Sequence, residues 1–130
     1  NSGGGTITLH AAAMDTRISV AVPSCYFCTY VNSIGTIAHC DCNYLPGILR
    51  LGEMYDVAGL IAPRPISVIA GRDDKIFPVE YVQFAFDKLQ LIYQTAGVPD
   101  HCQLYVGQGG HRYYANGAWE FIRHHFDQAI

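Results

Sequence analysis

Short apolar segments alternate with helix-length amphipathic segments along the chain, and this alternation constrains the fold more than any other feature. The extended patterns cover residues 18–22, 66–70 and 103–106, and the helical patterns cover residues 4–14, 47–58, 79–96 and 116–128. Strands separated by helices of this length pair in parallel, with right-handed crossovers that place the helices on the sheet faces. The pattern therefore predicts an α/β domain of about three parallel strands with flanking helices.

Length and composition exclude several classes of protein. The 130 residues fit a single domain, and 50% hydrophobic with 15% charged residues argues against an intrinsically disordered chain. The formal net charge of −3 argues against nucleic-acid binding, which needs a basic surface. No apolar run approaches the roughly 18 residues of a membrane span. We therefore expect one domain over residues 1–130, with neither nucleic acid nor membrane as a partner.

The number of cysteines indicates which cellular compartment to expect. The chain has five, at positions 25, 28, 40, 42 and 102. An odd count without a visible signal segment favours a reducing compartment, so we expect a cytoplasmic protein. Four of them fall in residues 24–46, a stretch without clean periodicity that is typical of a long excursion or lid.

This Cys-rich excursion allows three interpretations. Cys25 and Cys28, together with His39, Cys40 and Cys42, carry the ligand types that zinc prefers, although the second cysteine pair is closer than in usual zinc sites. A disulfide within the group is a second possibility. The third is that the cysteines are small buried hydrophobic residues.

Candidate catalytic side chains lie in the loops at one edge of the predicted sheet. Asp73 and Asp74 follow the second strand, His111 follows the third, and Ser2 precedes the first helix. Functional groups of open parallel sheets collect beyond the carboxyl ends of the strands. The order Ser, Asp, His along the chain is that of the α/β-hydrolase triad.

The first residues of the chain match a nucleophile elbow. Asn1-Ser2-Gly3-Gly4 fits G-x-S-x-G without its leading glycine, and the elbow needs small neighbours because its serine lies in a strained turn. The backbone N–H of Gly3, as the residue after the nucleophile, would contribute to an oxyanion hole. The alternative is that Ser2 only caps the following helix.

With these motifs, the chain resembles the C-terminal half of an α/β-hydrolase of the acetyl xylan esterase and dienelactone-hydrolase-like kind. The stretches that carry the resemblance are Asn1–Gly5, His39–Gly47, Gly59–Pro65, Gly71–Pro78 and Gly110–Tyr114. The resemblance implies that Ser2 is the nucleophile, His111 the general base and Asp74 the residue that orients His111. It implies no cofactor and no metal.

Competing residues exist for two of these roles. Asp73 adjoins Asp74, but the spacing from Gly71 and Pro78 in the family pattern favours Asp74. Among the histidines, only His111 follows a strand end in a glycine-rich turn. The other histidines lie in predicted helices, before the third strand or in the excursion: His10, His39, His101, His124 and His125.

We therefore predict a serine carboxylesterase acting on small acyl esters, with acetylated sugars as candidates by resemblance. The alternatives are a non-catalytic oligomerising fragment of such an esterase, a related serine peptidase and a Cys/His metal-binding domain. The family's earlier half would supply the second oxyanion donor, whose loss costs roughly 10²- to 10³-fold in rate. We thus expect weak activity from this chain alone. We also expect pairing of two copies through the exposed edge at 18–22, unless the chain is a fragment of a complete esterase.

Overall fold

A two-stranded parallel sheet lies at the centre of the computed structural model, which describes residues 1–126. Its strands are β1 (Ile66–Gly71) and β2 (Cys102–Gly107), paired in register from one end to the other. Every residue of β1 is buried, as expected of a strand covered on both faces. Both strands end within one residue of the predicted bounds.

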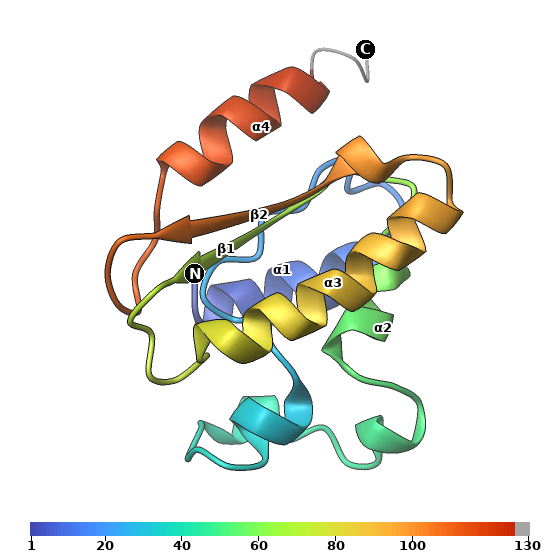
Figure 1. Cartoon of the computed structure of the whole chain (residues 1–130). Helices are drawn as coiled ribbons and strands as arrows, with labels where there is room; N and C mark the ends of the chain where they lie inside the picture. The colour runs from blue at the N-terminus through green and yellow to red at the C-terminus, as the bar shows by residue number, and fades with distance from the viewer. Residues whose placement is uncertain (127–130) are drawn as a thin grey trace.

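Helices cover both faces of this sheet (Figure 1). The helices are α1 (Gly3–Met14), α2 (Met54–Gly59), α3 (Val79–Thr95) and α4 (Asn116–Phe126). Helix α4 lies on one face, and α1, α2 and α3 lie on the other. The last two residues of the predicted helix 116–128 lie outside the described residues. Shorter turns connect these elements: a π-helical turn at Tyr30–Ile34 and 3₁₀ turns at Asp41–Asn43, Ile48–Arg50 and Pro99–His101.

The strand predicted at 18–22 is not a regular strand. Instead, the chain meets β1 through two isolated parallel bridges, at Ala21 and Ser24. Pro23 lies between the bridges and has no N–H to donate to a continuous ladder. The parallel arrangement is as predicted, but the third strand is reduced to this extended segment. The pairing of two copies along its outer edge stays a prediction.

The helix predicted at 47–58 is also divided, into the turn Ile48–Arg50 and helix α2. The break lies at Glu53, whose side chain accepts the N–H of Met54 while the Asp56 side chain accepts the N–H of Glu53. The first N–H groups of a helix have no acceptor within the helix, and here the Glu53 and Asp56 side chains accept two N–H groups at this point. This capping box therefore marks the start of a separate helix.

The Ala-Pro-Arg-Pro stretch anchors the far end of α1. The Arg64 guanidinium donates hydrogen bonds to the carbonyl oxygens of Ala12 (2.7 Å), Asp15 (3.0 Å) and Ile18 (2.7 Å). These carbonyls lie at or just beyond the C-terminal end of α1, where backbone acceptors lack partners and positive charge is favourable. Arg64 thereby fixes α1 against the segment that leads into β1.

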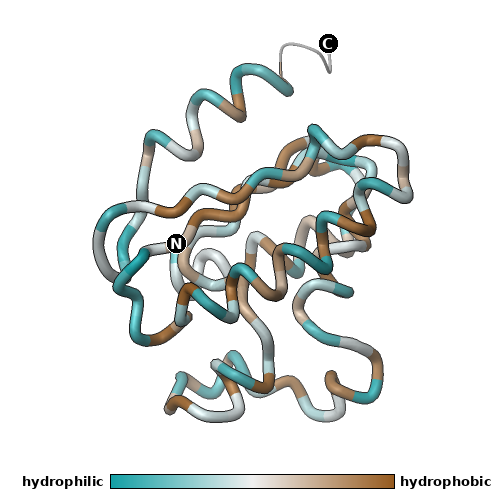
Figure 2. The backbone as a smooth tube through the Cα atoms, in the orientation of Figure 1, coloured by the Kyte–Doolittle hydropathy of each residue, from teal (hydrophilic) through white to brown (hydrophobic). Residues whose placement is uncertain are grey.

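The hydrophobic core lies between the sheet and the three helices on its lower face. Apolar residues line the strands and the inward sides of the helices (Figure 2). The fully buried side chains at its centre include Leu9 of α1, Met54 of α2, Val68 of β1 and Leu89 of α3. No helix within residues 1–126 combines the length and the apolar character needed to cross a bilayer.

Gly5 allows α1 to approach the segment that follows Ser24. A Cβ atom at Gly5 would lie 2.7 Å from the Ser24 carbonyl oxygen and 2.8 Å from the Tyr26 Cβ, whereas one at Gly4 would meet nothing within 4 Å. We expect Gly5→Ala to lower the free energy of unfolding by about 1–3 kcal/mol. The control Gly4→Ala should stabilise the protein by up to about 1 kcal/mol, because alanine favours a helix. Urea denaturation measures both changes, and equal effects would contradict the packing argument.

Candidate active site

Ser2 occupies a strained turn at the start of α1. Its backbone has φ 53° and ψ −122°, a conformation that non-glycine residues rarely adopt. The Ser2 N–H donates to the Ser24 carbonyl (2.9 Å), and the Ser2 carbonyl accepts from the Thr6 N–H (3.0 Å). The Ser2 side chain makes no capping hydrogen bond with α1. The helix-cap alternative therefore has no support, and the backbone has the strain expected of a nucleophile elbow.

The N–H of Gly3 is free at the start of this helix. The N–H of Gly4 donates to the Asn1 carbonyl and that of Thr6 to the Ser2 carbonyl, but that of Gly3 has no partner among residues 1–126. An unpaired N–H at a helix N-terminus favours a negatively charged oxygen. Gly3 is thus available for the oxyanion role predicted for it.

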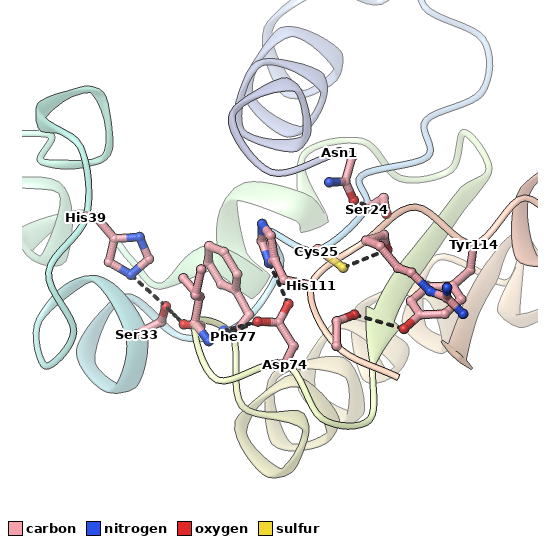
Figure 3. Close-up of polar contacts among 12 residues, drawn as sticks. Asn1, Ser24, Cys25, Ser33, His39, Asp74, Phe77, His111 and Tyr114 are labelled. Carbon is pink, nitrogen blue, oxygen red and sulfur yellow. Dashed lines mark hydrogen bonds and ion pairs between the residues drawn. The ribbon is translucent and has the colours of Figure 1, made fainter. Parts of the chain in front are cut away.

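Asp74 and His111 are in direct contact (Figure 3). The His111 Nδ1 and the Asp74 Oδ2 are 2.8 Å apart, and Oδ1 of Asp74 accepts the N–H groups of Ile76 (2.9 Å) and Phe77 (3.2 Å). An ionised carboxylate can only accept hydrogen bonds, so Nδ1 carries the proton and Nε2 is the basic atom. The Nε2 atom has no hydrogen-bond partner within the described chain.

Two glycine-containing loops hold this Asp–His pair together. A Cβ at Gly71 would overlap the carbonyl oxygen of Gly110, so the loops after β1 and β2 pack backbone against backbone. The N–H of Asp73 donates to the Gly109 carbonyl (2.9 Å) across the same junction. The contact between Asp74 and His111 therefore depends on loop packing as well as on the side chains.

The competing residues lie elsewhere. Asp73 is exposed, and His111 pairs with the buried Asp74 instead. His39 bonds the Ser33 hydroxyl, and burial lowers the pKa of its imidazole. His10 contacts Tyr30, and His101 the Pro63 carbonyl. Within residues 1–126, His111 is the histidine that pairs with a carboxylate.

Ser2 borders a pocket of about 190 Å³. Ser2, Gly3, His39 and Phe77 are among its lining residues. The Phe77 ring stacks on the His111 imidazole, with ring centroids 5.9 Å apart and planes inclined by 19°. No hydrogen bond joins the Ser2 hydroxyl to His111 in the described part of the chain. The structure thus joins Asp74 to His111 and places Ser2 on a pocket whose wall touches His111.

Cys25 borders the Asp–His pair on the other side (Figure 3). Its backbone has φ 46°, its thiol donates to the Arg112 carbonyl (3.2 Å), and burial raises the pKa of the thiol. The Cys25 sulfur and ligand atoms of Asp74 and His111 all lie within 4.8 Å of one another. No sequence pattern predicts that Cys25 lies beside Asp74 and His111.

The hypothetical zinc site is not assembled. Among residues 1–126, Cys25 with Asp74 and His111 is the one group of potential ligands that lies so close together, and it shares only Cys25 with the predicted set. Cys28 is buried, which raises the pKa of its thiol to about 12. Cys25, Cys28 and Cys102 are buried as small hydrophobic residues, whereas Cys40 and Cys42 are exposed.

No protein-family model matches the chain. The chain is 27% identical over 111 residues to YtaP of Bacillus subtilis (strain 168), which is described as a hydrolase. This match covers 83% of the chain but 37% of the relative. The chain thus spans well under half the length of the curated protein that it matches.

Several solved structures that are similar to this chain are esterases. A glucuronoyl esterase of carbohydrate esterase family 15 from Caldicellulosiruptor kristjansonii has a TM-score of 0.78 at 18% identity, covering 99% of this chain and 42% of that one. A methylesterase has a TM-score of 0.75 at 23% identity, covering 98% and 29%. A glucuronoyl esterase catalytic domain from Hypocrea jecorina has a TM-score of 0.70 at 18% identity, covering 98% and 43%. The chain has part of the α/β-hydrolase fold, which confirms the predicted fold class.

Proposed function

We propose that this chain carries the catalytic residues of a serine carboxylesterase. The observation that supports this most is the strained backbone of Ser2 at the start of α1, on a pocket that Phe77 also lines while its ring stacks on His111 of the Asp74–His111 pair. Backbone strain at a non-glycine residue is costly and clusters at functional sites. Neither helix capping nor core packing requires it here.

The proposed reaction forms an acyl-enzyme. The Ser2 hydroxyl attacks the ester carbonyl while Nε2 of His111 takes its proton, and Asp74 stabilises the resulting imidazolium. The Gly3 N–H stabilises the oxyanion. His111 then gives the proton to the departing alcohol, and it activates the water that releases the acid.

The substrate is proposed to be a small ester attached to a carbohydrate. The pocket beside Ser2, at about 190 Å³, suits a small acyl group such as acetyl. The similar structures are named as glucuronoyl esterases and a methylesterase, so methyl esters of uronic acids are the second substrate class to test.

A fluorophosphonate probe tests the proposed nucleophile, because it labels only an activated serine. We expect labelling of Ser2, located by peptide mapping, together with hydrolysis of p-nitrophenyl acetate. Ser19→Ala is the control, because Ser19 lies far along the chain and makes no side-chain hydrogen bond among residues 1–126. A folded protein that the probe leaves unlabelled would favour the non-catalytic alternative. Cleavage of peptides in place of esters would favour the peptidase.

A further inference from the structure

Cys40 and Cys42 form a pair of exposed thiols in direct contact. Their sulfur atoms are 2.8 Å apart, not far from the roughly 2.05 Å of a disulfide bond. Both side chains are exposed, whereas Cys25, Cys28 and Cys102 are buried. Burial also raises the thiol pKa of Cys28 and Cys102 to about 12, which leaves them unreactive. Cys40 and Cys42 are therefore the cysteines whose thiols are accessible to react.

The surroundings give the two thiols different roles. The Asn43 side-chain amide donates to the Cys40 sulfur (3.1 Å) and the Cys40 carbonyl (3.3 Å), and it donates to the Cys42 sulfur over a longer distance (3.7 Å). The hydrogen bond between the two sulfurs raises the pKa of the Cys42 thiol. The thiolate is the attacking form, and we assign the attack to Cys40 because its sulfur lies nearer to the Asn43 donor.

We propose that Cys40 and Cys42 are a reversible dithiol–disulfide couple, oxidised by a small disulfide such as glutathione disulfide. The Cys40 thiolate attacks one sulfur of the oxidant, whose S–S bond breaks and releases one glutathione thiolate. Cys42 then loses its proton and attacks the Cys40 sulfur, which forms the protein disulfide and releases the second glutathione. Two protein thiols are oxidised, and one glutathione disulfide is reduced to two thiols.

One member of the couple, Cys40, lies on the wall of the proposed active-site pocket. Cys40 and Asn43 line this pocket together with Ser2. The buried Asn43 also accepts a hydrogen bond from the Thr6 hydroxyl (3.4 Å), and Thr6 bonds the Ser2 carbonyl through its N–H. A disulfide would displace the Cys40 sulfur that accepts the Asn43 amide, so we expect oxidation to move Asn43 and slow reactions at Ser2. This part rests on the proposed function.

Mass spectrometry of the intact protein tests the couple without any assay of activity. With glutathione disulfide, the wild type should lose the mass of two hydrogens, and a reducing agent should restore it. Cys42→Ser should instead gain one glutathione at Cys40, because the resolving thiol is absent. Peptide mapping should find Cys25, Cys28 and Cys102 unmodified. A wild type that stays reduced, or that keeps glutathione without closing, would overturn the proposal.

The rate of fluorophosphonate labelling tests the connection with Ser2. Treatment with glutathione disulfide should slow labelling of the wild type. The same treatment should not change the labelling rate of the double variant Cys40→Ser/Cys42→Ser. An unchanged rate in an oxidised wild type would refute the connection while leaving the couple intact. Absence of labelling in either state would count against the esterase alone, since the mass change is measured separately.

Discussion

Replacing Ser2 by alanine is expected to lower kcat for p-nitrophenyl acetate by roughly 10⁴- to 10⁶-fold and to abolish fluorophosphonate labelling. In the proposed reaction the Ser2 hydroxyl is the atom that accepts the acyl group, and it is the atom that this substitution removes. The Gly3 N–H and the Asp74–His111 pair stay in place in the variant. The residual rate would therefore measure what the binding site and the oxyanion donor contribute alone.

A second substitution at Ser2 separates the chemistry from the fold. Glycine tolerates positive φ, so Ser2→Gly should be equally inactive yet raise the free energy of unfolding by about 1 kcal/mol. Such opposite effects on activity and stability are expected where backbone strain serves a catalytic turn. A Ser2→Gly protein that hydrolyses the ester like the wild type would refute the assignment of the nucleophile.

Local periodicity predicted the helices and strands whose own residues show a clear apolar pattern. Helix α3 has apolar residues on one face and Gly97 just beyond its end, at φ 76°, so its prediction from 79 to 96 differs from the structure by one residue. The segment at 18–22 has the apolar composition of a strand. Its hydrogen-bond ladder with β1 is interrupted because Pro23 has no N–H to donate. The apolar composition of the segment does not reveal this missing hydrogen bond.

The candidate site, like the fold, could be predicted from the sequence only in part. The rule that functional groups follow the ends of parallel strands found Asp74 and His111 without any structure. It could not find Phe77 stacked on His111 or Cys25 beside it, because these contacts join segments far apart in the chain. It also could not show that the closely packed glycine of α1 is Gly5, since that depends on how near the Ser24 carbonyl comes.

Asp74→Asn is the second variant with a large expected effect, a fall in kcat of about 10⁴-fold. The asparagine can still accept the N–H groups of Ile76 and Phe77 through its oxygen, so the loop keeps its conformation. Its amide nitrogen would then face His111 Nδ1 and donate to it. That places the imidazole proton on Nε2, where it prevents His111 from accepting a proton from Ser2.

Asp73→Asn is the matched control, because it makes the same change of charge one residue earlier. The Asp73 side chain is exposed and makes no contact with His111, so its loss should leave kcat within about twofold of the wild type. Steady-state hydrolysis of p-nitrophenyl acetate and the rate of fluorophosphonate labelling measure both variants. Equal losses in the two variants would mean that the negative charge of the loop matters rather than the hydrogen bond to Nδ1. A much larger loss of kcat in Asp74→Asn would show that the hydrogen bond to His111 Nδ1 is needed, because the two variants carry the same net charge.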